Sequence, residues 1–189
     1  MKNIPLAILD EHPDWLNPLY QEFQKRGVPY QKIDISSAAY NPMDTNVLPF
    51  YVNRLSPSAS KRGYQTAFNY TLNYLMYLES LGSRVVNGSH SVILETSKAH
   101  QSSLLRKLNI PQPRTIVLND LALLDKYLDE FVFPVVVKPN CGGSGLGIQK
   151  FNTKKSCWKR EMKARLSCPM KKSYYSKSLF SQKIIILSV

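Results

Sequence analysis

Cysteine is scarce in this 189-residue sequence, and its distribution excludes two kinds of structural cross-link. Three thiols do not make a disulfide framework, and these lack the close pairing and the histidine partners of a zinc site. They are Cys141, Cys157 and Cys168. This pattern predicts a cytoplasmic protein, because the cytosol keeps thiols reduced.

Long hydrophobic runs are also missing. The longest apolar run near the end, Ile184 to Leu187, is far too short to cross a bilayer. Asp10 and Glu11 interrupt the short apolar run that follows Lys2, so no secretory signal is expected. We therefore expect neither a membrane span nor a membrane partner.

Acidic residues are few, and almost none lie in the last part of the chain. Residues 1–150 carry 15 basic and 12 acidic residues, a net charge of +3. Residues 151–189 carry 10 basic residues and one acidic residue, Glu161, a net charge of +9. The chain is therefore predicted to be a nearly balanced protein followed by a basic tail.

A basic tail favours two kinds of partner, nucleic acid and anionic lipid. Trp158, Tyr174 and Tyr175 are interleaved with the basic residues and could stack on bases. The alternative interpretation is a shift of reading frame near Lys155, which would leave a tail that was never selected to fold. We favour the second interpretation, and the coding sequence tests it.

What is present is enough apolar material for a core, with 43% hydrophobic and 11% aromatic residues. The first part alternates between strand and helix patterns. Residues 4–9 and 28–35 have the composition of strands, and a helix is expected to open over 10–13. Helical spacing places Trp15 and Tyr20 on the core face of this helix.

A second group of elements completes a small domain. Strands are predicted over 47–55 and 84–86, with a long helix over 60–81 between them. The core stripe of that helix includes Met76. The alternation predicts an α/β domain over residues 1–88.

The pattern changes after residue 88. A helical stretch is predicted over 89–109, with a break near Thr96 and Ser97. The elements expected after it are a strand over 115–118, a helix over 120–131, and strands over 133–139 and 147–151.

Glycines are concentrated between the last two of these strands. Four of the chain's 8 glycines fall within residues 142–147. Because the loop joins strand to strand, it is predicted to be the tip of a hairpin. This excludes a P-loop, which needs Lys-Ser/Thr and a helix after its last glycine, and a Rossmann fingerprint, which also opens a helix.

Lys138 lies near the end of the strand before this loop. Alone it would be an ordinary strand-end lysine that reaches solvent. Beside a glycine-rich loop it indicates a phosphate ligand, since bare backbone N–H groups can approach phosphate oxygens while the lysine supplies charge. Lys98 is less specific, because it could also be a lysine at the edge of a helical face.

These segments together resemble the ATP-grasp superfamily, and the branch that contains the ribosomal-protein glutamate ligase is the most similar. The resemblance covers about residues 1–153 and rests on segments that occur in the family's order. They are Lys98 with 99–105 after it, 110–115, 133–139 and 142–148. It implies a pre-ATP-grasp α/β domain followed by the first, ATP-binding subdomain of an incomplete ATP-grasp fold.

The resemblance also implies cofactors and site residues. Family members use ATP and Mg²⁺ to convert a carboxylate to an acyl phosphate, which an amine then attacks. Lys98 and Lys138 would bind the nucleotide and the glycine loop would close over its phosphates. The loop residues concerned are Gly142, Gly143, Ser144, Gly145 and Gly147. No catalytic residue is assigned.

The family pattern stops after about Lys154, so the expected domains are 1–88, 89–154 and an aberrant or disordered tail over 155–189. A later strand with a glutamate and the acidic Mg²⁺ ligands are expected to be absent. We therefore expect this chain to have no ligase activity by itself, and to act as a non-catalytic fragment if nothing completes it.

Other candidate residues are less informative. The histidines lie far apart in the sequence, so no metal ligands are assigned. Arg54 and Ser56 sit at the end of a predicted strand, where open α/β sheets often bind ligands, and they could face a carboxylate or amine substrate. A structural role for both is at least as well supported.

Overall fold

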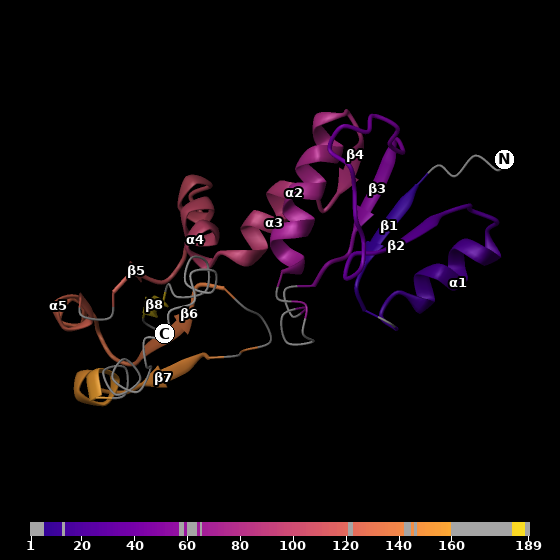
Figure 1. Cartoon of the computed structure of the whole chain (residues 1–189). Helices are drawn as coiled ribbons and strands as arrows, with labels where there is room; N and C mark the ends of the chain where they lie inside the picture. The colour runs from indigo at the N-terminus through magenta and orange to yellow at the C-terminus, as the bar shows by residue number, and fades with distance from the viewer. Residues whose placement is uncertain are drawn as a thin grey trace. The chain divides into compact units, whose positions relative to one another are not determined.

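The structure is a computed structural model of the chain. It describes residues 6–12, 14–56, 59, 64, 66–120, 123–141, 145, 147–159 and 183–187. The chain forms two compact units, residues 1–95 and 96–189 (Figure 1). The first unit therefore extends a few residues beyond the expected boundary at residue 88.

The first unit is a parallel sheet with helices on both faces. Its elements are β1 (Ala7–Asp10), α1 (Asn17–Lys25), β2 (Gln31–Asp34), β3 (Phe50–Asn53), α2 (Ala67–Ser80), β4 (Arg84–Val86) and α3 (Ser89–Thr96). The strand order is β2-β1-β3-β4, and every neighbouring pair is parallel. The alternation of strand and helix predicted for this region is confirmed.

Side-chain alternation in β1 divides the core of this unit between the two faces. Ile8 packs with Leu16 and Tyr20 beside α1. Ala7 and Leu9 belong to the larger cluster that includes the fully buried leucines of α2, Leu75 and Leu78. Strands that are buried on both faces explain why β1 is apolar until its last residue.

Two core assignments in this unit are wrong. Trp15 is 55% exposed and stacks on His12, with 4.2 Å between ring centroids, because α1 begins only at Asn17. Met76 is 53% exposed. The inner face of α2 is instead made by Ala67, Thr71, Leu75 and Leu78, so a threonine takes a core position that hydrophobicity alone does not reveal.

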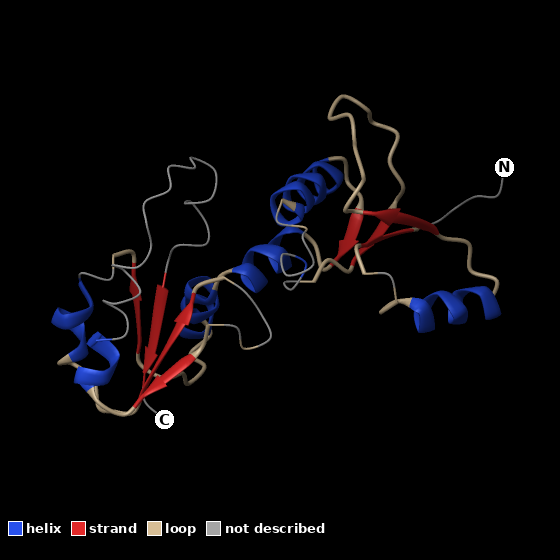
Figure 2. Cartoon of the chain, turned by 60° about the horizontal axis from the view of Figure 1, so that its bottom comes forward, coloured by secondary structure: helices blue, strands red, loops and turns tan. Residues whose placement is uncertain are grey.

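The second unit is an antiparallel sheet. Its elements are α4 (Lys98–Lys107), β5 (Thr115–Leu118), α5 (Leu124–Leu128), β6 (Val135–Pro139), β7 (Gln149–Phe151) and β8 (Lys183–Leu187), and residues 154–159 are also helical. The strand order is β5-β8-β6-β7. α5 and the 154–159 helix cover one face of the sheet and α4 lies on the other (Figure 2). The predicted hairpin of β6 and β7 is confirmed by their antiparallel pairing.

β8 differs from what the sequence analysis expected of the tail. Residues 183–187 pair with β5 on one side and β6 on the other, so they form an inner strand of the sheet. The apolar run that is too short for a membrane is long enough for a strand. Residues 183–187 of the predicted tail therefore form a strand, and this strand contains no glutamate. Residues 160–182 and 188–189 of the predicted tail lie outside the described residues.

Within the described ranges, none of the helices combines the length and the apolar character that crossing a bilayer requires.

Candidate functional site

Lys138 lies on the face of β6 that points away from the apolar core. Val135 and Val137 are buried in that core, with Leu124 and Leu128 of α5, and the alternation of β6 turns Lys138 to the opposite face. The side chain is half-buried rather than fully solvated. An inner strand therefore holds this lysine at a fixed position near the hairpin tip.

Lys98 is the first residue of α4, and Asn140 ties it to the end of β6. The backbone N–H of Lys98 donates to the Asn140 carbonyl at 3.1 Å, and Lys98 Nζ donates to the same oxygen at 3.2 Å. The Asn140 side-chain oxygen accepts from the N–H of Ala99 at 3.0 Å and from Ser97 Oγ at 3.3 Å. These contacts hold Lys98 beside the end of β6, the strand that carries Lys138.

The electrostatics of the pair fit an anion site. Burial lowers the pKa of Lys138, and the positive charge of Lys98 lowers it further. Burial also lowers the pKa of Lys98. Two half-buried ammonium groups that repel each other gain from a bound anion, because the anion offsets both the desolvation and the repulsion.

The glycine loop adds a second feature of an anion site. Gly145 and Gly147 have φ values of +71° and +75°, which L-residues with side chains rarely adopt. A Cβ on Gly147 would also lie 3.1 Å from Cδ of Pro139. Gly142, Gly143 and Ser144 lie outside the described residues, so their predicted contacts stay predictions.

Comparison with solved structures identifies the fold. A RimK-domain ATP-grasp protein from Sphaerobacter thermophilus superimposes with a TM-score of 0.68 at 16% identity, over 97% of this chain and 63% of that protein. The D-alanine–D-alanine ligase of Bacillus anthracis gives 0.63 at 17% identity, over 99% and 57%. The chain has part of the ATP-grasp fold. The fold predicted from the sequence resemblance is therefore confirmed.

A third ATP-grasp structure widens the comparison. The ATP-grasp ligase PsnB, complexed with its precursor peptide and AMPPNP, gives a TM-score of 0.60 at 15% identity, over 99% of this chain and 66% of that protein. The chain thus spans less than two thirds of the length of each of these three proteins. No family model and no curated protein matches the sequence.

Asn140 is the site residue that sequence reasoning missed. It is 6% exposed, and its partners lie more than forty positions earlier in the chain. Local patterns do not reveal such a contact. The available signal was an asparagine between a strand-ending proline and a glycine loop, which is also a common composition for a turn.

We predict that Asn140→Ala loosens the start of α4. The substitution leaves the N–H of Ala99 without its acceptor in a half-buried position, which costs up to about 1–3 kcal/mol. Hydrogen exchange at Ala99 and Gln101 should therefore become faster. Asn140→Asp keeps an oxygen acceptor and serves as the control. Equal protection of these amides in wild type and Asn140→Ala would contradict the role of Asn140 in fixing the start of α4 to the end of β6.

Cys141 follows Asn140 and lies within the field of Lys98. Burial raises the pKa of the Cys141 thiol, and the charge of Lys98 acts in the opposite direction. The thiolate is therefore scarce at neutral pH. This thiol is a reporter of the charge on Lys98.

We predict that Lys98→Gln slows alkylation of Cys141 by iodoacetamide at pH 8. Without the lysine charge the pKa of the thiol rises further, so less of the reactive thiolate is present. Mass spectrometry of the peptide that carries Cys141 measures the rate, and Lys107→Gln at the other end of α4 is the control. Faster alkylation in Lys98→Gln would show that Lys98 shields the thiol sterically instead.

Arg54 and Ser56 belong to the first unit, directly after β3. The N–H of Arg54 donates to the Leu9 carbonyl at 2.9 Å, and the N–H of Ser56 donates to Oε1 of Glu11 at 3.1 Å. Burial raises the pKa of Glu95, and the charge of Arg54 opposes that rise. The substrate role predicted for both residues is not tested by these contacts and stays a prediction.

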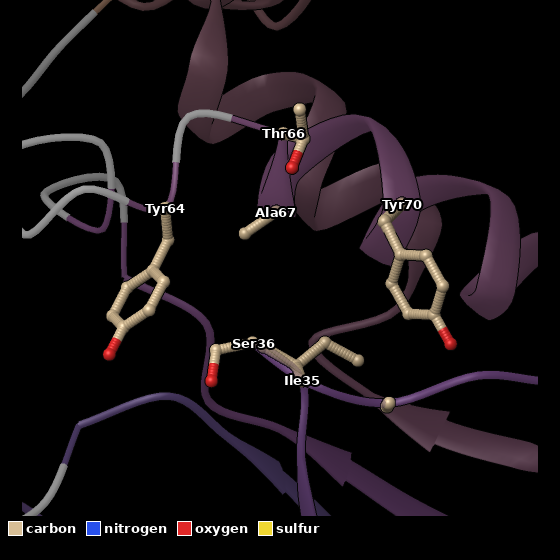
Figure 3. Close-up of a pocket in the computed structure, with 7 residues that line it drawn as sticks. Ile35, Ser36, Tyr64, Thr66, Ala67 and Tyr70 are labelled. Carbon is tan, nitrogen blue, oxygen red and sulfur yellow. The ribbon is translucent and has the colours of Figure 1, made fainter.

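The first unit also contains a small cavity of about 240 Å³. Tyr64 and Tyr70 stand on opposite sides of it with Ala67 between them, and Ser36 lies at its base (Figure 3). Arg54 and Ser56 do not line this cavity. No functional role is predicted for its lining residues from the sequence, because the loop after β2 and the start of α2 carry no motif.

Within the described parts of the chain, no group of three His, Cys, Asp or Glu side chains is arranged to hold a metal ion. Lysines and glycines, rather than carboxylates, form the site at α4 and β6. The chemistry of this donor set fits phosphate oxygens.

Proposed function

We propose that this chain is the nucleotide-binding part of an ATP-dependent carboxylate–amine ligase. The observation that carries the proposal is the pair Lys98 and Lys138, held together through Asn140 beside a hairpin with two glycines at positive φ. The ATP-grasp fold supports it, because the similar structures include ligases.

The residues of this chain have a positioning role in the proposal. Lys138 binds phosphate oxygens from a strand that cannot move freely, and Lys98 neutralises part of the same charge from the start of α4. Glycines in the hairpin let backbone N–H groups approach the phosphates. When bound, ATP with Mg²⁺ supplies the phosphoryl group that activates a carboxylate.

The proposal also covers the substrates and the part of the reaction in which this chain takes part. We propose a glutamate-type acid and an amine on a peptide or protein. One similar protein, PsnB, was solved with a precursor peptide, and another is a D-alanine–D-alanine ligase. The described residues supply no carboxylate cluster for Mg²⁺, so our proposal limits this chain to nucleotide contact.

Calorimetric titration of the full chain tests the proposal. We expect saturable binding of one ATP per chain, weaker binding of AMP and none of adenosine, because the lysines recognise phosphates. Addition of Mg²⁺ should change the affinity little. Equal affinity for adenosine and ATP would contradict the proposal, and tight binding that requires Mg²⁺ would contradict the limitation to nucleotide contact.

A further inference from the structure

An open groove lies at the other end of α4 from Lys98. Its volume is about 580 Å³, and its walls are one side of α4 and the extended segment that leads into β5. Ser102, Ser103 and Arg106 line it from α4, and residues 109–115 line it from the segment. Arg106 lies eight residues after Lys98, roughly 12 Å along the helix axis, and the groove begins at Ser102, roughly 6 Å from Lys98 along the same axis.

The wall opposite α4 is fixed to the helix by side-chain hydrogen bonds. Ser102 Oγ donates to Oε1 of Gln112 at 2.8 Å, and Nε2 of Gln112 donates to the Ser102 carbonyl at 2.8 Å. The N–H of Ile110 donates to the Leu105 carbonyl at 2.9 Å. The groove is therefore preformed, which reduces the ordering cost of binding a ligand.

Its two arginines have different roles. Arg114 is held in place, because it pairs with Glu130, donates to the Glu130 carbonyl at 2.7 Å and lies 4.7 Å above the Phe131 ring. Arg106 is exposed, and its guanidinium has no ion pair or hydrogen bond with any residue that the structure describes. Arg106 is thus the free cation of the groove within the described part of the chain.

The stretch of sequence around Arg106 contains no acidic residue. Residues 96–119 contain Lys98, Arg106, Lys107 and Arg114 and no acidic residue. A guanidinium recognises a carboxylate or a phosphate through two parallel hydrogen bonds, a geometry that an ammonium group cannot match. Charge complementarity therefore selects an anionic ligand, and the shape and polar groups of the groove decide its class.

The size and polarity of the groove favour a chain rather than a single small anion. A volume of about 580 Å³ exceeds what one carboxylate fills, and the groove is open to solvent. Ser103 donates its hydroxyl to Ala99 at 3.0 Å and can still accept, so peptide N–H groups have a partner. β5 has β8 as its one neighbour among the described strands, so a peptide could also extend along the outer side of β5.

We propose that this groove binds an extended acidic peptide segment and that Arg106 anchors one of its carboxylates. The peptide binds independently of the nucleotide, since its anchor Arg106 and the nucleotide contact Lys98 lie at opposite ends of α4. This interaction adds a partner surface to the chain and does not depend on the proposed ligase function.

Fluorescence anisotropy with a fluorescein-labelled hexaglutamate peptide tests the proposal on the full chain. Arg106→Gln should weaken binding about tenfold or more, which corresponds to loss of a charge-assisted hydrogen bond. Lys107→Gln removes the same charge from the next residue, which does not line the groove, and should change the affinity less than twofold. The basic residues after position 150 attract any polyanion equally in both variants, so this pair isolates the groove.

Further variants and ligands distinguish specific recognition by Arg106 from net charge and from nucleic-acid binding. Arg106→Lys should recover only part of the affinity, because it restores charge without the planar fork. Equal losses in Arg106→Gln and Lys107→Gln would overturn the proposal, since net charge alone would explain the binding. Arg106-dependent binding of single-stranded oligouridine that is tighter than binding of hexaglutamate would assign the groove to nucleic acid and also overturn it.

The two proposals fail separately. Lys138→Gln should leave hexaglutamate binding unchanged while it weakens ATP binding. Loss of peptide binding in Lys138→Gln would overturn the independence of the groove. Circular dichroism of each variant confirms that the helices are intact before the affinities are compared.

Discussion

Replacing Lys138 by glutamine should weaken ATP binding by about tenfold to a hundredfold. A hydrogen bond to a charged group contributes about 1.5–3 kcal/mol, and that range corresponds to this loss of affinity. Lys138 is held by an inner strand, which fixes its position in the site. Lys155→Gln, which removes an exposed lysine from the 154–159 helix of the same unit, should have little effect.

The same substitution should have the opposite effect on stability. Lys138 is desolvated and repelled by Lys98, so the free protein gains when the charge is removed. Urea unfolding of Lys138→Gln should therefore show equal or higher stability than wild type, while calorimetry shows the loss of ATP binding. Lower stability with unchanged ATP affinity would mean that Lys138 is a structural residue.

The pH dependence of ATP binding gives a further check on this residue. Since burial and Lys98 lower the pKa of Lys138, its charge is lost at a lower pH than that of an exposed lysine. ATP affinity should fall as pH rises through this lowered pKa, and the fall should be smaller in Lys138→Gln. An identical pH profile in the two proteins would show that Lys138 does not titrate in the site.

Local patterns predicted the parts of this site that short-range physics decides. Ser97 separates α3 from α4 because its side chain accepts from the N–H of His100 at 3.2 Å, a helix start visible in the sequence. The β6–β7 hairpin was predictable for a similar reason, since glycines cluster between two apolar runs. Lys138 could then be placed by strand alternation alone.

The remaining parts depend on contacts between residues far apart in the sequence. Asn140 acts through Ser97 and Ala99, and Trp15 is exposed because the helix starts later than its spacing indicates. Thr71 occupies a core position that its polarity argues against. In each case tertiary packing overrides the local preference, which a single sequence does not show.

β8 is the strongest example, because composition and chain position both argued against it. The basic composition after residue 154 indicated a segment without a fold, yet an antiparallel sheet with β5 and β6 apart needs a strand between them. Ile184 to Leu187 is the β-branched and apolar run that meets this need. The place between β5 and β6, together with this short apolar run, accounts for the strand.

Replacing Ile185 by proline should disrupt this sheet and test whether residues 183–187 are folded into it. Ile185 lies opposite Ile116 of β5 and Val137 of β6. Because β8 has a neighbouring strand on each side, the N–H of Ile185 points toward one of them. Proline removes that donor and leaves a buried carbonyl unpaired, which should cost the second unit roughly 2 kcal/mol or more. Hydrogen exchange at Ile116 and Val137 should become faster.

The first unit provides an internal reference for this experiment. Amide protection at Ile8 and Leu9 of β1 should stay unchanged, because β1 belongs to a separate sheet. Ile185→Val, which keeps the N–H and the preference for strands, should behave like wild type. If Ile185→Pro instead left the protection of β5 and β6 intact, residues 183–187 would not be part of the sheet, and the prediction of an unfolded tail would stand.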